Sequence, residues 1–210
     1  MMRIALTLRV TNAHDYDEPR DSISHDWLRQ AASRNIQPLL IPNITSSPEQ
    51  YMKDLDPDLL ILTGGGDAGD SAERDLTEEL LFKSALEGNI PVLGVCRGLQ
   101  RINQILEGSL VPIEGHVRND HAVSFAPEWH DIYGPETMVN SYHNIAIGPG
   151  ELSPSLCAAG TDADGMIEAA YMPEHPVAGI MWHPERAGAP EADWVLMQRL
   201  ATRTLFKTKV

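Results

Sequence analysis

The stretch that decides the fold is IPVLGVCRGLQRIN, residues 90–103, in which a short apolar run changes abruptly into a helical pattern. Residues 90–95 predict a buried strand, and the run that follows Cys96 predicts a helix that begins at once. Gly94 and Gly98 stand two residues to either side of Cys96. This is the spacing of the G-x-S-x-G turn with sulfur in place of oxygen, and it predicts a thiol held on a tight strand-to-helix turn.

The position of Cys96 also favours reactivity. A helix N-terminus carries about half a positive charge, which stabilises a thiolate, and its free backbone N–H groups can bind an oxyanion. We therefore predict that Cys96 is a nucleophile. The alternative is a buried structural cysteine, because free cysteines are among the most buried residues.

Outward from this turn, the first two thirds of the chain alternate short β-rich runs with helical patterns. The predicted strands are 3–9, 36–41 and 58–62, and the predicted helices are 22–34, one that begins at Ser47-Pro48, and 75–88. Beyond residue 110 we predict strands at 121–125, 156–160, 165–171 and 177–182 and a last helix at 190–205. The pattern indicates an α/β fold, a mostly parallel sheet flanked by helices with short antiparallel additions in the C-terminal half.

Length and composition limit the classes of function. A chain of 210 residues suits one domain, 1–210. Its net charge of −14, with no cluster of lysine and arginine, argues against a nucleic-acid polymer as partner but is compatible with a small phosphorylated ligand. No apolar run reaches the roughly 18 residues that a membrane helix needs, and the N-terminus has no cleavable signal pattern. Two cysteines fit a reducing compartment, so we expect a cytoplasmic protein.

A base for the thiol is predicted at the end of the strand 177–182. His183-Pro184-Glu185 follows it, and residues i and i+2 of an extended chain point the same way, so Glu185 can orient the His183 ring. Taken alone, this could be a chance pair at an exposed strand end. Three glycines, 64–66, follow the strand 58–62 and could supply backbone donors opposite the N–H of Arg97.

Four motifs together resemble those of the class I glutamine amidotransferase superfamily, and within it the γ-glutamyl-γ-aminobutyrate hydrolase-like family of cysteine hydrolases. They are LTGGGD at 62–67, GVCRGLQRIN at 94–103, VNSYHN at 139–144 and MWHPE at 181–185. The resemblance covers nearly the whole chain. It implies a flavodoxin-like core, a Cys-His-Glu triad and a γ-glutamyl thioester released by water, with no cofactor and no metal.

Carried over by position, the resemblance makes Cys96 the nucleophile, His183 the base and Glu185 its orienting acid, with oxyanion donors at the backbone of Gly65 and Arg97. Its substrate contacts would be Gly64, Gln100, Asn140, Ser141 and His143. His143 reads equally well as a hydrogen-bonded structural histidine. This chain has Ile145 where the family often has glutamine, so recognition of the glutamyl end is expected to differ.

The short chain also resembles the compact γ-glutamyl-CDP-amidate hydrolases, which help make phosphoramidate groups for surface polysaccharides. The segment 9–21 follows the first strand, where loops line the ligand crevice of an open sheet, so Arg9 or Arg20 could meet a carboxylate or a diphosphate. A solvated loop is the alternative. His116, Arg118 and His121 form a second polar cluster, either substrate contacts or surface, and Cys157 is expected to be packed in a strand.

Other functions stay open at this point. The same triad would serve a hydrolase of γ-glutamyl-γ-aminobutyrate or a glutaminase subunit that passes ammonia to a synthase partner. A catalytically idle binding domain is a third alternative, against which the intact triad argues. In each enzymatic case the ligand is a small γ-glutamyl amide, and a homodimer is compatible with the sequence.

Overall fold

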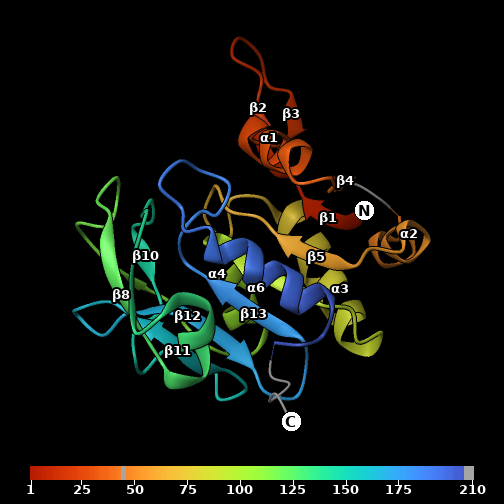
Figure 1. The fold of residues 1–210 in the computed structure, drawn as a ribbon. Coiled ribbons are helices and arrows are strands. Elements are labelled where there is room, and N and C mark those ends of the chain that lie inside the picture. The colour runs from red at the N-terminus through yellow and green to blue at the C-terminus, as the bar shows by residue number, and fades with distance from the viewer. Residues whose placement is uncertain (44–45, 206–210) are drawn as a thin grey trace.

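The computed structural model describes residues 1–43 and 46–205, and these residues form a central sheet of nine strands (Figure 1). Across the sheet the strands are β4 (Ile36–Ile41), β1 (Met2–Thr7), β5 (Leu59–Leu62), β6 (Val92–Val95), β13 (Val177–Ile180), β12 (Ile167–Met172), β11 (Cys157–Thr161), β8 (His121–Phe125) and β9 (Glu136–Val139). The α/β class predicted from the sequence is confirmed.

The first half of the sheet is parallel, with β4, β1, β5, β6 and β13 pairing in turn. Numbered along the chain, these strands lie in the order 2-1-3-4-5, which is the flavodoxin-like order. The register places Gly94 of β6 between Leu62 of β5 and Gly179 of β13. The carboxyl ends of these three strands therefore meet at one edge, and the segments that follow them come together there.

The second half of the sheet is antiparallel, as β12, β11, β8 and β9 follow β13 in successive antiparallel pairs. The predicted antiparallel additions are therefore present, with four strands beside the five of the parallel core. Two-residue strands, β7 (Val111–Pro112) and β10 (Ile145–Ala146), form a small separate ladder that the sequence analysis did not predict.

Helices cover both faces of the sheet because the strand residues are apolar on both sides. Leu59 and Ile61 of β5 belong to the core under α1 (His25–Ser33), α5 (His130–Tyr133) and α6 (Ala192–Ala201). Leu60 and Leu62 belong to the core under α2 (Pro48–Leu55), α3 (Ala72–Glu87) and α4 (Arg97–Ile105). Within the described residues, no helix combines the length and apolarity needed to cross a bilayer.

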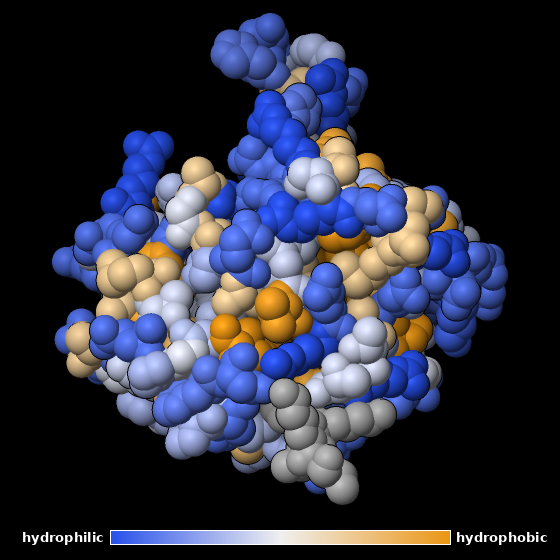
Figure 2. All heavy atoms as spheres, in the orientation of Figure 1, coloured by the Kyte–Doolittle hydropathy of each residue, from blue (hydrophilic) through white to orange (hydrophobic). Residues whose placement is uncertain are grey.

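The segment after β1 differs from the prediction. Strand β1 ends at Thr7, and residues 9–21, expected as a loop, contribute to the antiparallel hairpin β2 (Arg9–Asn12) and β3 (Pro19–Ser22). The hairpin stands off the rest of the molecule in Figure 1, and its surface is mostly hydrophilic in Figure 2. A polar, exposed ribbon of this kind has no apolar run by which the sequence could signal strands.

Helix boundaries shift where a side chain caps the helix. The Ser24 hydroxyl accepts the Asp26 N–H, so α1 begins at His25 rather than at residue 22, and the Ser71 hydroxyl accepts the Arg74 N–H, so α3 begins at Ala72. Cys157 lies in a strand as predicted, but its side chain is exposed rather than packed.

Candidate active site

Cys96 lies on a strained turn between β6 and α4. Its φ of 52° and ψ of −109° are values that residues with a side chain rarely adopt. The turn is tight because a Cβ on Gly98 would lie 2.0 Å from the Leu62 carbonyl oxygen, and one on Gly94 would lie 2.6 Å from the Leu99 nitrogen. The backbone N–H of Cys96 donates to Ile180 at 2.8 Å, which fixes the turn to β13.

His183 and Glu185 follow β13 and are buried beside Cys96. The Nδ1 of His183 lies 2.8 Å from Oε1 of Glu185, as the i, i+2 spacing predicted. Burial lowers the pKa of His183, but hydrogen bonds with Cys96 and Glu185 outweigh it and raise that pKa to about 9. The His183 side chain is therefore an imidazolium at neutral pH, held between the Cys96 sulfur and the Glu185 carboxylate.

The glycine loop after β5 lies against this pair. A Cβ on Gly64 would lie 2.6 Å from Cε1 of His183 and 3.3 Å from Cβ of Cys96, so the site admits no side chain at this position. Gly65 has a φ of 91°, and the aliphatic part of Arg9 packs over it. The loop and the first turn of α4, where backbone N–H groups have no partner within the helix, thus enclose Cys96 from two sides.

A cavity of about 100 Å³ opens onto Cys96. Its lining includes four predicted site residues besides His183, namely Gly65, Arg97, Gln100 and His143. Tyr142 and Arg186 also line it, and the sequence analysis missed both. The Arg186 guanidinium lies 4.0 Å from the Tyr142 ring centre, and that ring meets His183 edge-on. In the sequence, the signal for Tyr142 and Arg186 was that they stand next to His143 and Glu185.

Asn140 and Ser141 make their contacts within the protein. The Asn140 amide accepts the backbone N–H of His183 at 2.9 Å and donates to its carbonyl at 3.0 Å. The Ser141 hydroxyl donates to the His116 carbonyl. In the structure Asn140 holds the backbone of His183 and Ser141 holds a neighbouring loop, and contact of either residue with substrate stays a prediction.

Gln100 and His143 share one backbone acceptor in the cavity wall. The Gln100 amide donates to the Ile145 carbonyl at 2.8 Å, and Nδ1 of His143 lies 3.1 Å from the same oxygen. Their positions therefore depend on each other through Ile145. That is the residue at which the chain departs from the family pattern.

A buried ionic network supports the glycine loop, and the sequence analysis did not foresee it. Arg74 donates to the carbonyl oxygens of Thr63 and Gly65, and its Nε lies 2.9 Å from Glu78. The Arg97 side chain pairs with Glu78 and Asp75. The i, i+4 spacing of Arg74 and Glu78 was a visible signal, but such pairs usually lie on exposed helix faces.

The two arginines predicted near the substrate have different surroundings. Arg9 lines a second, smaller cavity that also touches Gly64, Gly65 and His183. Arg20 lies on the exposed hairpin, where it bonds to Glu18 and to the Tyr16 hydroxyl. It lines neither of these two cavities.

Solved structures with the same fold include glutamine-hydrolysing proteins. The chain superposes on the glutaminase domain of Trypanosoma brucei CTPS with a TM-score of 0.71, 14% identity and coverage of 100% of this chain and 96% of that one. A glutamine amidotransferase from Thermotoga maritima gives a TM-score of 0.65 at 15% identity, covering 96% and 81%. These similarities define the class of fold as glutamine amidotransferase-like.

The particular family follows from sequence. Residues 4–185 match the Peptidase C26 model, and the chain belongs to that family. It is 33% identical to the γ-glutamyl-CDP-amidate hydrolase of Campylobacter jejuni over 88% of this chain and 90% of that protein. It is 28% identical to the γ-glutamyl-γ-aminobutyrate hydrolase of Escherichia coli K12, over 81% and 78%.

Proposed function

We propose that the protein hydrolyses γ-glutamyl amides through a thioester on Cys96. The observation that carries this proposal is the arrangement of Cys96, His183 and Glu185, a cysteine on a strained turn next to a buried imidazole whose pKa it raises and which a carboxylate orients. Both hydrolases described above act, by their names, on γ-glutamyl amides.

Each step uses a group in the cavity. The Cys96 thiolate attacks the γ-carbonyl carbon, and backbone N–H groups of Gly65 and Arg97 stabilise the oxyanion that forms. The His183 imidazolium gives its proton to the leaving nitrogen, and the C–N bond breaks to leave the γ-glutamyl thioester. The neutral imidazole then takes a proton from water, hydroxide adds to the thioester, and glutamate leaves as the thiolate is restored. Asn140 acts indirectly, by holding the His183 backbone.

For the leaving group we prefer a nucleotide-linked amidate of the γ-glutamyl-CDP-amidate type, which would place the enzyme in phosphoramidate synthesis for surface polysaccharides. The similarity to the Campylobacter enzyme supports it, and so does Arg186, a cation in the wall of the cavity that could pair with a diphosphate. An aminobutyrate amide is the alternative that the Escherichia coli relative favours.

The test is glutamate release from γ-glutamyl-CDP-amidate, γ-glutamyl-γ-aminobutyrate and glutamine by the isolated chain. Cys96→Ala should abolish release from every substrate, and Cys157→Ala, which removes the exposed thiol, should leave it unchanged. Turnover by Cys96→Ala would overturn the proposal. A chain active only when a synthase is added would instead favour a glutaminase subunit, the function suggested by the fold of the CTPS domain.

The leaving group is tested by a pair of arginine variants. Arg186→Ala should raise KM for the nucleotide amidate at least tenfold and change KM for glutamine little, since only the former carries phosphates for the guanidinium to pair with. Arg20→Ala, outside the cavity, is the matched control. Equal effects of Arg186→Ala on both substrates would argue against the nucleotide.

A further inference from the structure

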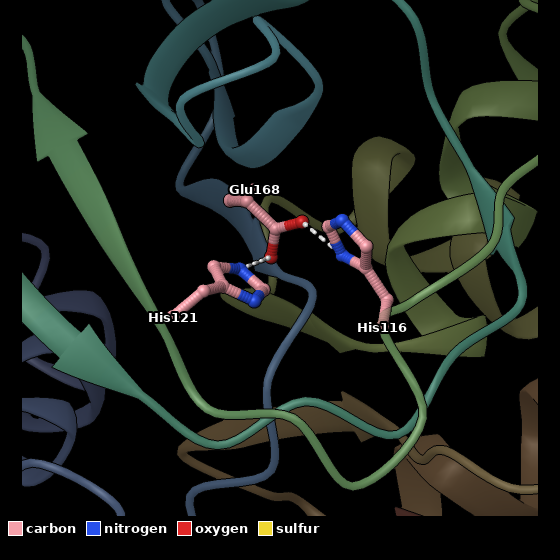
Figure 3. Close-up of side chains that lie close together, drawn as sticks. All are labelled: His116, His121 and Glu168. Carbon is pink, nitrogen blue, oxygen red and sulfur yellow. Dashed lines mark ion pairs between the residues drawn. The ribbon is translucent and has the colours of Figure 1, made fainter.

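Four side chains outside the triad converge beside the cavity. His116 comes from the loop before β8, His121 from the start of β8, His143 from the segment before β10 and Glu168 from β12. Figure 3 shows the His116 and His121 rings on either side of the Glu168 carboxylate. We propose that these residues form a binding site for one divalent transition-metal ion of the Zn²⁺ type.

The spacing of the donor atoms fits such an ion. One donor atom from each of His116, His121 and Glu168 lies within 4.8 Å of the other two, and His143 adjoins this group of three through its contact with Glu168. The Glu168 oxygens lie 3.8 Å from Nδ1 of His116, 3.4 Å from Nε2 of His121 and 3.4 Å from Nε2 of His143. Donors bound tetrahedrally to zinc at its usual bond lengths are about 3.3 Å apart, so small movements would close the site.

In the described part of the chain, no donor atom in the cluster has a partner with good hydrogen-bond geometry, although Glu168 forms ion pairs with His121 and His143 at 3.4 Å. Within the described residues, Nδ1 of His116, Nε2 of His121, Nε2 of His143 and both Glu168 oxygens are buried and unsatisfied. Buried polar atoms normally have partners, because leaving one without costs roughly 1–3 kcal/mol. A metal ion shared by these five buried atoms, which are grouped around Glu168, would explain why none of them has a partner with good hydrogen-bond geometry in the described chain.

In His143 and His116, one ring nitrogen contacts a carbonyl or carboxylate outside the cluster, and the other ring nitrogen is left facing Glu168. Nδ1 of His143 must donate to the Ile145 carbonyl, which leaves the Nε2 lone pair directed at Glu168. Nε2 of His116 lies 3.3 Å from Asp162, whose other oxygen accepts the N–H groups of Asp164 and Met166. Carboxylates and carbonyls that hold the second ring nitrogen in this way are typical of histidines that bind metals.

The alternative is a network that shares protons. It would have to place cationic rings together, since the His116 ring centre lies 4.7 Å from that of His121 and 4.9 Å from that of His143. Glu168 and Asp162 together balance two positive charges, so a third protonated ring would meet like-charge repulsion at low dielectric. A dication bound by neutral rings satisfies all four side chains at once.

A closed set of three imidazoles and one carboxylate is typical of a structural rather than a catalytic metal. The ion would join the loop before β8, the segment 140–146 and β12. Since His143 and Gln100 share the Ile145 carbonyl, it would also fix the wall of the cavity. The inference does not depend on the proposed function, because it concerns binding and stability.

The experiment uses the full chain without a histidine tag, stripped with a chelator and titrated with Co²⁺ as a spectroscopic substitute for Zn²⁺. We expect one Co²⁺ per chain, with the intense visible absorption of four-coordinate Co²⁺, and competition by Zn²⁺. His121→Ala and Glu168→Gln should each weaken binding at least tenfold. His14→Ala, a fully exposed histidine outside the cluster, is the matched control.

Thermal unfolding gives a second readout. Zn²⁺ should raise Tm of the wild type and of His14→Ala and should not raise Tm of the cluster variants, because only a folded site binds the ion. If Glu168→Gln fails to fold, His121→Ala decides, since the His121 side chain lies at the partly exposed edge of the cluster. Wild-type binding no tighter than that of His121→Ala, or a Tm indifferent to Zn²⁺, would overturn the proposal.

Discussion

At the scale of single residues, Glu185 helps to raise the pKa of His183, the base in the proposed reaction. In the wild type, the His183 pKa of about 9 means that the imidazolium persists at neutral pH and loses its proton as pH rises through that value. Glu185→Gln removes a charge that raises this pKa. We expect kcat to fall about 100-fold or more and the alkaline limb of kcat/KM to move to lower pH.

The measurement is the pH–rate profile of glutamate release. Glu191→Gln is the control, because Glu191 is an exposed carboxylate paired with Arg34. An alkaline limb that stays in place in Glu185→Gln would show that the activity does not depend on the His183 proton.

Gly64 gives a second residue-scale prediction. A Cβ at this position would overlap Cε1 of His183, so Gly64→Ala should displace the imidazole and lower kcat at least 100-fold while the protein stays folded. Gly150→Ala is the matched control, since a Cβ there meets nothing within 4 Å. Kinetics and circular dichroism of both variants separate a displaced ring from lost stability. Wild-type activity in Gly64→Ala would contradict the geometry.

The sequence could suggest the turn at Cys96 and the pair His183 and Glu185 because the geometry of each is local, whereas their assignment to one site came from the family resemblance. The turn at Cys96 requires glycines at fixed spacing, and Glu185 lies two residues from His183 in extended chain. It could not say which atoms Asn140 would bind. A motif indicates that a residue lies near a site, whereas the choice between substrate and the His183 backbone is made by tertiary packing.

At the scale of elements, the buried strands were predictable because each is a short apolar run, as in residues 59–62. The hairpin β2–β3 was not, because strands such as RVTN and PRDS carry no apolar pattern. The partners of Glu78 and Glu168 were not predictable either. Charged residues ordinarily indicate solvent, and these two are buried because Arg97 beside Glu78, and the histidines beside Glu168, come from other segments of the chain.

Helix α6 supplies a prediction about stability. Its Asp193 is buried and accepts hydrogen bonds from the Tyr133 hydroxyl and the Trp182 indole at 2.8 and 2.9 Å. Burial raises the Asp193 pKa from 3.8 to about 7. Between these two values the folded state holds a proton that the unfolded state has lost, so the contribution of Asp193 to the free energy of unfolding declines as pH rises.

Asp193→Asn keeps an oxygen for both hydrogen bonds and cannot ionise. We expect the stability of the variant relative to the wild type to increase as pH rises through this window and to level off above it. Urea denaturation at several pH values measures the difference. Asp131→Asn, at an exposed carboxylate paired with Arg199, should show no such trend. A constant difference for Asp193→Asn would refute the assignment.

At the scale of the whole molecule, one sheet separates two cores, and we predict that they unfold together as a single domain. All four tryptophans, Trp27, Trp129, Trp182 and Trp194, belong to the core under α1, α5 and α6. Tryptophan fluorescence therefore reports on one face of the sheet, and far-ultraviolet circular dichroism reports on both. Coincident urea transitions are expected for one cooperative unit, whereas separate midpoints would show two.

The backbone at Cys96 also has an evolutionary consequence. Its dihedral angles suit glycine, so the chain keeps a cysteine there against a steric preference of roughly 1–3 kcal/mol. If Cys96 is the nucleophile of the proposed reaction, selection for activity maintains that choice. In a descendant freed from such selection, mutation to glycine would both disarm the enzyme and relieve the strain. Inactive descendants of this lineage should therefore accumulate glycine at position 96 more readily than the loss of function alone would require.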